Sequence, residues 1–263
     1  MFASIFTLAT AGVGVALFVA MLALLELGRR IGKRKLAKHG KDAESGVGVV
    51  DATVYGLLSL LIGFSFAGAA SRFDHRRELI ADEINALGTA YLRVDALPTS
   101  AQGPVREAFR AYMDALVAAY TGTIRAANAL HETDEMKRAQ QVLWSRAVSA
   151  CLAPGGEPAR MLLLPSLNES FDSVEMEFLA RRVHPPFVIF VMLGLAALAA
   201  AVFGGMGLAS APARNLVHGI GFAATIAIAV YVIIELEYPR LGVIRVSKMD
   251  QALVELRDSV RER

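Results

Sequence analysis

The residue types that most often carry catalysis or bind metals are present in this chain, but their spacing completes no motif. His131-Glu132 begins a zinc-like pattern, yet the second histidine that such a helix needs is missing. Gly63-Phe64-Ser65-Phe66-Ala67 lacks the final glycine of a nucleophile elbow. No glycine-rich phosphate loop is present, and the one cysteine, Cys151, cannot form an internal disulfide. The sequence therefore predicts no enzyme, no cofactor and no metal site.

Basic residues cluster in one place, although the net charge of the chain is only +2. Such a run could bind nucleic acid, but a short basic segment beside an apolar one is typical of the cytoplasmic edge of a membrane. We therefore expect the run to lie on anionic lipid headgroups, with no nucleic-acid partner. Its members are Arg29, Arg30, Lys33, Arg34, Lys35, Lys38 and Lys41.

Long uncharged runs hold many of the apolar residues. The chain is 55% hydrophobic, and its mean hydropathy is +0.46. A helix that crosses a bilayer needs about 20 predominantly apolar residues, and buried helices of soluble proteins rarely run that far without a charge. The first run lacks a basic start and is too long for a signal peptide, so we expect it to be retained. The runs are Phe2–Leu25, Ala52–Ser71, Pro185–Ala213 and Asn215–Ile234.

These runs predict an all-α integral membrane protein with four transmembrane helices and a helical extramembrane domain between the second and third. The domain is expected to be helical because apolar residues such as Phe109, Met113 and Leu116 recur every three or four positions. We expect transmembrane helices at 1–28, 47–71, 185–210 and 215–236, a basic connecting loop at 29–46, the extramembrane domain at 72–184, and a C-terminal tail with a short helix at 237–263.

Two ridges of side chains run along the second transmembrane helix. One ridge is built of small residues, which let another helix approach closely in lipid. The neighbouring ridge contains Leu60 and Phe64, and it would narrow a passage if several copies of the helix surrounded an axis. An apolar ring of this kind can gate ions by dewetting. The alternative is that Leu60 and Phe64 contact lipid or other helices of the same chain. The small residues are Ser59, Gly63, Ala67 and Ser71.

The stretch from Leu61 to Asp74 resembles the pore-helix region of bestrophins, in which a Gly-Phe pair in an apolar helix is followed by an arginine and aromatic residues. Most of the chain, from about residue 50 to residue 250, resembles the bacterial bestrophin-like domain family. Three stretches carry this resemblance, and the last is the most specific. They are EINALGTAYLR at 83–93, LLPSLNE at 163–169 and EYPRLGVIRVS at 237–247.

The resemblance implies a homo-oligomer, a pentamer as in bestrophins, that conducts small ions and prefers anions. Leu60 and Phe64 match neck residues by position, while Gly56 replaces a third bulky side chain. Arg72 and Arg76 would then place positive charge at the pore exit, where it favours anions. The chain departs from the bestrophin pattern after Arg72, where only one aromatic residue follows, and no acidic calcium clasp can be aligned.

Two functions therefore stay open on the sequence. The first is an oligomeric ion channel with an apolar neck on the second transmembrane helix. The second is a non-conducting membrane scaffold or sensor whose large, charged helical domain binds a partner. A transporter is disfavoured, because transporters place ionisable groups or broken helices at mid-membrane, whereas Asp51, His218, Glu235 and Glu237 lie near helix ends.

We expect a multi-pass protein of the bacterial inner membrane. The short basic segment at 29–41 predicts a cytoplasmic loop, which places both termini and the helical domain on the outer side. Two features oppose this orientation. Basic residues also flank the membrane on the other side, and bestrophins keep their helical domain in the cytosol. The opposing basic residues are Arg72, Arg76, Arg77, Arg240, Arg245 and Lys248.

Overall fold

A computed structural model shows an all-helical chain over the residues that it describes, which are 2–39, 47–125, 133–210, 216–238, 243 and 247–262. It contains four helices long and apolar enough to cross a membrane, with α3 (Thr99–Arg125), α4 (Asp134–Leu152) and α5 (Glu157–Ala180) between the second and third. The predicted fold class is therefore confirmed. The chain divides into a membrane unit, Ser4–Arg72 with Pro185–Tyr238, and an extramembrane unit, Phe73–His184 with Pro239–Arg263 and Met1–Ala3.

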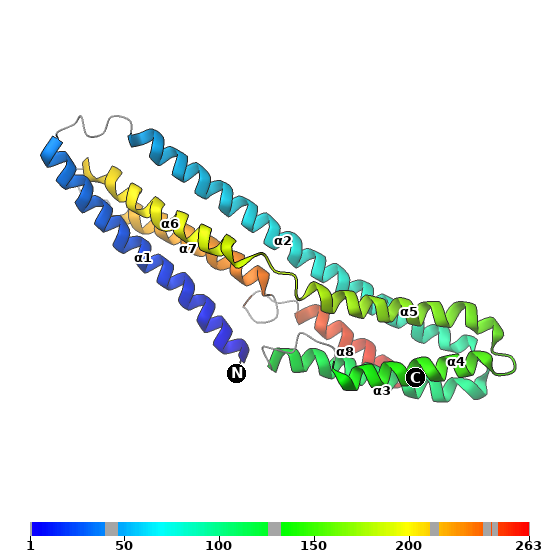
Figure 1. Cartoon of the computed structure of the whole chain (residues 1–263). Coiled ribbons are helices and arrows are strands. Elements are labelled where there is room, and N and C mark those ends of the chain that lie inside the picture. Colours follow the sequence, from blue (N-terminus) through cyan, green and yellow to red (C-terminus); the bar gives the residue numbers. More distant parts are fainter. Residues whose placement is uncertain are drawn as a thin grey trace. The chain divides into compact units, whose positions relative to one another are not determined.

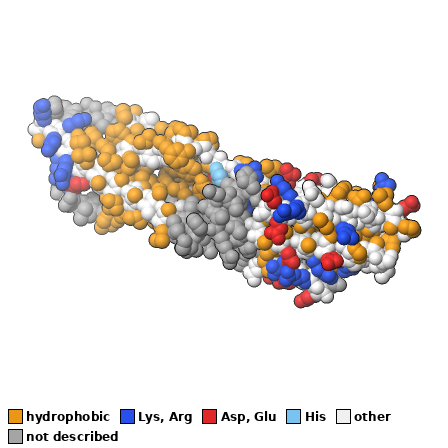
Figure 2. Space-filling view, turned by 60° about the horizontal axis from the view of Figure 1, so that its bottom comes forward, with side chains coloured by type: hydrophobic (Ala, Val, Ile, Leu, Met, Phe, Trp, Pro, Cys, Tyr) orange, Lys and Arg blue, Asp and Glu red, His pale blue; other side chains and the backbone are white. Residues whose placement is uncertain are grey.

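The membrane unit consists of long helices that run lengthwise beside one another (Figure 1). Only a helix satisfies all its own backbone hydrogen bonds within one segment, so an apolar run of this length must be helical in lipid. Figure 2 shows hydrophobic side chains over these helices, with Lys and Arg gathered at one end. The helices are α1 (Phe2–His39), the first part of α2 (Val47–Arg93), α6 (Phe187–Gly207) with the 3-10 turn η3 (Leu208–Ser210), and α7 (Leu216–Glu237).

The basic segment continues the first span. Because α1 extends to His39, most of the segment expected at 29–46 as a connecting loop is helical. Residues 29–38 hold six cations and contain no Gly-Pro pair that would end the helix. The helix continues through them because Lys and Arg are good helix formers. The remaining residues, 40–46, lie outside those that the structure describes.

Glycines bring α1 and α6 into close backbone contact. A Cβ placed on Gly28 would lie 2.1 Å from the carbonyl oxygen of Val202, and one placed on Gly205 would lie 2.0 Å from the carbonyl oxygen of Leu25. Gly32, one turn after Gly28, meets Met206 in the same way. Lipid gives no hydrophobic driving force between helices, so this close approach stabilises the pair through dispersion contacts.

The extramembrane unit begins with the second part of α2, which leaves the membrane unit without a break. Helix α3 is amphipathic and buries Phe109, Met113 and Leu116 against Leu143 of α4 and Leu163 of α5, which confirms the core face expected from the spacing. Other helices of this unit are η2 (Val94–Ala96), α3 (Thr99–Arg125), α4 (Asp134–Leu152), α5 (Glu157–Ala180) and α8 (Ser247–Glu262).

Local signals explain where α4 and α5 start. The side chain of Thr133 caps α4 by accepting a hydrogen bond from the backbone nitrogen of Met136 at 3.2 Å. Gly155 has φ +80°, a conformation that L side chains rarely adopt, and it turns the chain between α4 and α5. Pro165 lies inside α5, which continues past it to Ala180. The segment with His131 and Glu132 lies outside the described residues.

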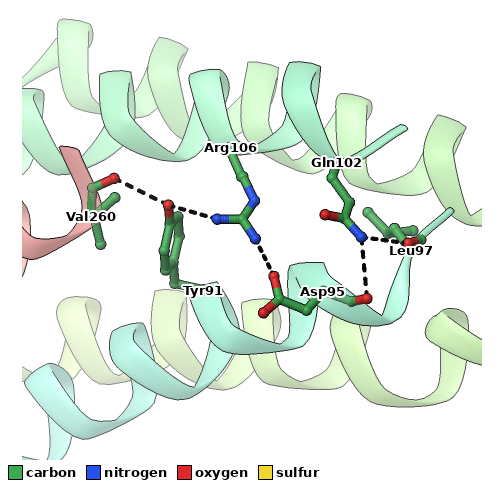
Figure 3. Close-up of polar contacts among 6 residues, drawn as sticks. All are labelled: Tyr91, Asp95, Leu97, Gln102, Arg106 and Val260. Carbon is green, nitrogen blue, oxygen red and sulfur yellow. Dashed lines mark hydrogen bonds and ion pairs between the residues drawn. The ribbon is translucent and has the colours of Figure 1, made fainter. Parts of the chain in front are cut away.

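A polar network fastens the C-terminal helix α8 to the end of α2 and to α3 (Figure 3). The hydroxyl of Tyr91 donates to the carbonyl oxygen of Val260 at 3.1 Å, and Arg106 donates to the Tyr91 hydroxyl at 3.2 Å. Arg106 also pairs with Asp95, whose carbonyl accepts a hydrogen bond from Gln102 at 3.2 Å. Arg110 of α3 also donates to the carbonyl oxygen of Val260 at 3.1 Å, so the end of α8 is held by side chains of α2 and α3.

Candidate functional site

The candidate constriction lies on an open face of α2. Leu60 is 52% exposed and Phe64 is 69% exposed within the single chain. The two residues lie one turn apart, so their side chains stand on the same line of the helix. Large apolar side chains on this face are free to contact lipid, another copy of the chain or a passage between copies. Their assignment as a pore constriction stays a prediction.

The predicted ridge of small residues lies on the same open side. Ser59, Gly63, Ala67 and Ser71 are all exposed. A Cβ placed on Gly63 would have no atom within 4 Å, and the same holds for Gly56. Among the residues that the structure describes, no other helix therefore packs on this ridge at Gly63, and a second helix could approach it closely.

The opposite face of α2 packs against the other spans. Leu58 and Ala69 are buried. The Tyr55 hydroxyl donates to the carbonyl oxygen of Ala200 in α6 at 3.3 Å, and the Tyr55 ring makes an edge contact with Phe222 of α7. The helix thus has one side fixed in the bundle and one side left open, and both predicted ridges fall on the open side.

The two arginines predicted at the pore exit stand in different surroundings. Arg72 belongs to the membrane unit, and its Nε donates to Oε1 of Glu237 at 2.9 Å. The Glu237 side chain is 0% exposed, whereas that of Arg72 is 31% exposed, so part of the guanidinium reaches the surface. The charge of Arg72 is therefore shared with a buried carboxylate. The pairing could not be found from the sequence, because the partners are 165 residues apart.

Arg76 belongs to the extramembrane unit and is buried. Its guanidinium donates to the carbonyl oxygens of Ala180, at 3.4 Å, and Val183, at 2.9 Å. Ala180 is the last residue of α5 and Val183 lies three residues beyond it, at the end of the helix where carbonyls lack intrahelical partners. A cation there also complements the negative end of the helix dipole. The contacts of Arg76 are those of a helix cap.

A buried polar cluster of the extramembrane unit was missed by the sequence analysis. The Tyr120 hydroxyl of α3 donates to Oε2 of Glu83 in α2 at 2.5 Å. Arg181 pairs with Glu177 at 2.5 Å, and its guanidinium lies 4.2 Å from the centre of the Tyr120 ring. Burial raises the pKa of the Tyr120 hydroxyl well above its ordinary value, and the carboxylates of Glu83 and Glu177 raise it further, against the opposing effect of Arg181. Glu83 stands inside the EINALGTAYLR stretch, and this family resemblance was the only sequence feature that pointed to the cluster.

A second missed contact ties α1 to α7. Thr10 donates from its hydroxyl to Oε1 of Glu235 at 2.8 Å, and both residues are buried. A buried carboxylate in a membrane unit is costly unless it is paired, which explains a threonine facing it. Within the described residues, no group of three or more His, Cys, Asp or Glu side chains is placed to hold a metal ion.

These features define a multi-pass helical membrane protein in which one long helix passes from a bundle of spans into a helical extramembrane unit. Residues 13–250 match the model of the bestrophin-like domain, so the chain belongs to the bestrophin-like family. The predicted family is thereby confirmed. Comparison with curated proteins finds no match.

Solved structures of bacterial bestrophins share the fold. The chain is similar to a single-substitution variant of a bestrophin homologue from Klebsiella pneumoniae, with a TM-score of 0.69 and 14% identity over 93% of this chain and 98% of that chain. A structure of that homologue phased with zinc matches with a TM-score of 0.65 and 12% identity over 91% of this chain and 98% of that chain.

Proposed function

We propose that the chain assembles into a homo-oligomer in the lipid bilayer, in which α2 of each copy lines a central path for small ions. The observation that carries this proposal is the open face of α2, where Leu60 is 52% and Phe64 is 69% exposed beside an unused ridge of small residues. One ridge would receive the neighbouring copy, and the other would face the axis. We propose five copies, because bestrophins are pentamers and the chain belongs to the bestrophin-like family.

The apolar side chains provide the gate in this proposal. Water leaves a narrow apolar ring readily, so Leu60 and Phe64 can block ions without a physical plug. Gly56 stands one turn before Leu60 and adds no bulk, so the constriction spans a single turn of the helix. The exposed part of Arg72 then biases the passage toward anions through a local positive potential.

Exposed apolar side chains on the extramembrane unit favour the alternative function, a scaffold that binds a partner protein. Large apolar side chains stand exposed on α4 and α5, with Met161 at 78%, Leu152 at 69% and Val142 at 51%. If these side chains form one patch, they offer a site for contact with another protein. A partner protein bound there would make the extramembrane unit a receptor for it, with the spans serving as an anchor.

Reconstitution separates the two functions. Purified protein is placed in liposomes loaded with chloride, and efflux is followed for wild type and for a variant with Phe64→Ala, which opens the ring. Chloride efflux above that of empty liposomes, larger for the variant, supports the channel. If neither protein conducts while the assembled oligomer is confirmed in the same liposomes, the channel proposal is wrong and the scaffold stands.

A further inference from the structure

Helices α1 and α7 run antiparallel with a fixed register. A Cβ placed on Gly14 of α1 would lie 3.4 Å from the Cβ of Tyr231, and one placed on Gly219 of α7 would lie 3.4 Å from Cδ2 of Leu25. As the residue number rises along α1, the number of the α7 residue beside it falls. One turn beyond Leu25, α1 therefore reaches the level at which α7 begins, which is Leu216.

The residue of α1 at that level is Arg29. It stands four positions after Leu25, so the two side chains share one line of the helix, and the Leu25 side chain contacts α7. The backbone of this line, at the carbonyl oxygen of Leu25 and the nitrogen of Arg29, lies against Gly205 of α6. Side chains of a helix lean toward its N-terminus, so we expect the guanidinium of Arg29 to reach the level of the first turn of α7.

Arg29 is buried without a partner at its inner nitrogen. The residue is only 9% exposed, and its Nε has no hydrogen-bond partner among the residues that the structure describes. The neighbouring cation differs in both respects, since Arg30 is exposed and pairs with Glu26 at 3.1 Å. A buried guanidinium is stable only when its N–H groups are hydrogen-bonded and its charge is balanced.

The start of α7 supplies the complementary half of an anion site. The first backbone N–H groups of a helix have no intrahelical partner, and the helix dipole makes this end positive. A helix N-terminus facing a guanidinium binds phosphate groups well, because both offer several N–H donors. Acidic side chains are absent from the described positions in the first turn of α7.

We propose that Arg29 and the N-terminus of α7 bind a phosphate group at the edge of the membrane. Arg29 stands four positions after Leu25, the last residue of the apolar run of the first span, and Lys and Arg side chains gather at one end of the hydrophobic surface (Figure 2). This is the depth at which phospholipid headgroups lie. The same chemistry would accept inorganic phosphate, and the site is separate from the open face of α2.

The test compares matched variants and three probes. Thermal unfolding of the purified protein is followed in detergent micelles that contain phosphatidylglycerol, a diacylglycerol with the same tails and no phosphate, or potassium phosphate. Phosphatidylglycerol should raise the melting temperature of wild type, and the diacylglycerol should not. Arg29→Gln should weaken the response about tenfold in midpoint concentration, because hydrogen bonds to a charged group are lost. Arg30→Gln, which removes an equal but exposed charge, should respond as wild type does.

The outcomes separate the ligand sources and can overturn the site. A shift with potassium phosphate that is lost in Arg29→Gln supports the site and assigns it to a soluble anion. Equal responses of Arg29→Gln and Arg30→Gln to phosphatidylglycerol would mean that only the overall charge matters and would overturn the proposal. If Arg29→Gln does not fold, Arg29→Lys keeps the charge but loses the paired donors. An unweakened response of that variant would also overturn it.

Discussion

At the scale of single residues, Leu60 and Phe64 make the sharpest test of the open face of α2. Replacing either with Ala should raise ion leak through reconstituted protein, and Ser should raise it further, because a polar ring holds water that an apolar ring releases. Phe66→Ser is the matched control, since Phe66 is 46% exposed but stands two positions after Phe64, on another side of the helix. Planar-bilayer conductance is the measurement, and equal leak through the Phe66 and Phe64 variants would contradict the assignment.

The ion pair of Arg72 predicts a change in ion selectivity. Glu237→Gln removes the carboxylate that shares the charge of Arg72, so the reversal potential should move toward that of chloride. Arg72→Gln should move it in the opposite direction. Arg76→Gln is the contrasting variant, because Arg76 is buried and bonds to backbone carbonyls, so it should lower the melting temperature and leave selectivity unchanged. A selectivity shift from Arg76→Gln alone would refute this division of roles.

The buried hydroxyl of Tyr120 predicts a loss of stability at alkaline pH. Its pKa is raised above the ordinary value of 10.0 by burial and by nearby carboxylates, so the unfolded chain releases this proton at a lower pH than the folded chain. The stabilisation is complete below pH 10.0 and is lost as the pH rises through the folded-state pKa. Tyr120→Phe should cost about 1.5–3 kcal/mol at neutral pH and flatten the alkaline decline. Melting curves between neutral and alkaline pH test this, and an equally steep decline in the variant would contradict it.

At the scale of elements, replacing a glycine of a membrane helix with a large residue should have different effects at Gly28 and at Gly63. Gly28→Leu would drive a side chain into the backbone of Val202, so it should destabilise the subunit by at least about 3 kcal/mol. A Cβ on Gly63 has no neighbour within 4 Å among the described residues, so Gly63→Leu should leave the subunit folded and weaken only assembly between copies. Melting temperature and native mass spectrometry distinguish the two effects. Monomeric wild type, or intact oligomers of Gly63→Leu, would show that this ridge does not join copies.

The same contrast explains how far the sequence could be used to predict the structure. The spans followed from length and apolarity, because a bilayer leaves the backbone no alternative to a helix. The Thr133 cap reflects a local preference of the same kind, which the sequence itself contains. The close contact of Gly28 with α6 could not be predicted in this way, because the four-residue spacing of Gly28 and Gly32 names no partner helix. The pairing of Arg72 with Glu237 depends on how separate helices meet, which no local pattern contains.

At the scale of the whole molecule, α1 carries its basic residues as a direct continuation of the span. The helix runs from Phe2 to His39, so the cations at 29–38 stand immediately beyond the apolar stretch and count fully in orienting it. Anionic lipid on the cytoplasmic leaflet attracts such a segment at about 1 kcal/mol per basic residue near the surface. Both effects favour placing this end of α1 in the cytoplasm.

This orientation gives the last prediction, because the chain crosses the membrane an even number of times between its termini. If the basic end of α1 is cytoplasmic, the extramembrane unit and the C-terminus lie on the outer side. A reporter that is active only outside the cytoplasm, fused after Arg263, should therefore be active, and one that works only in the cytoplasm should be silent. Replacing Lys33, Arg34, Lys35 and Lys38 with Gln should weaken or reverse this bias, since charge near the span sets it. The same four residues replaced with Ser, a second uncharged side chain, should give the same result. Activity of the cytoplasmic reporter on the unaltered chain would show that the charges following α2 and α7 dominate and that the extramembrane unit lies in the cytosol.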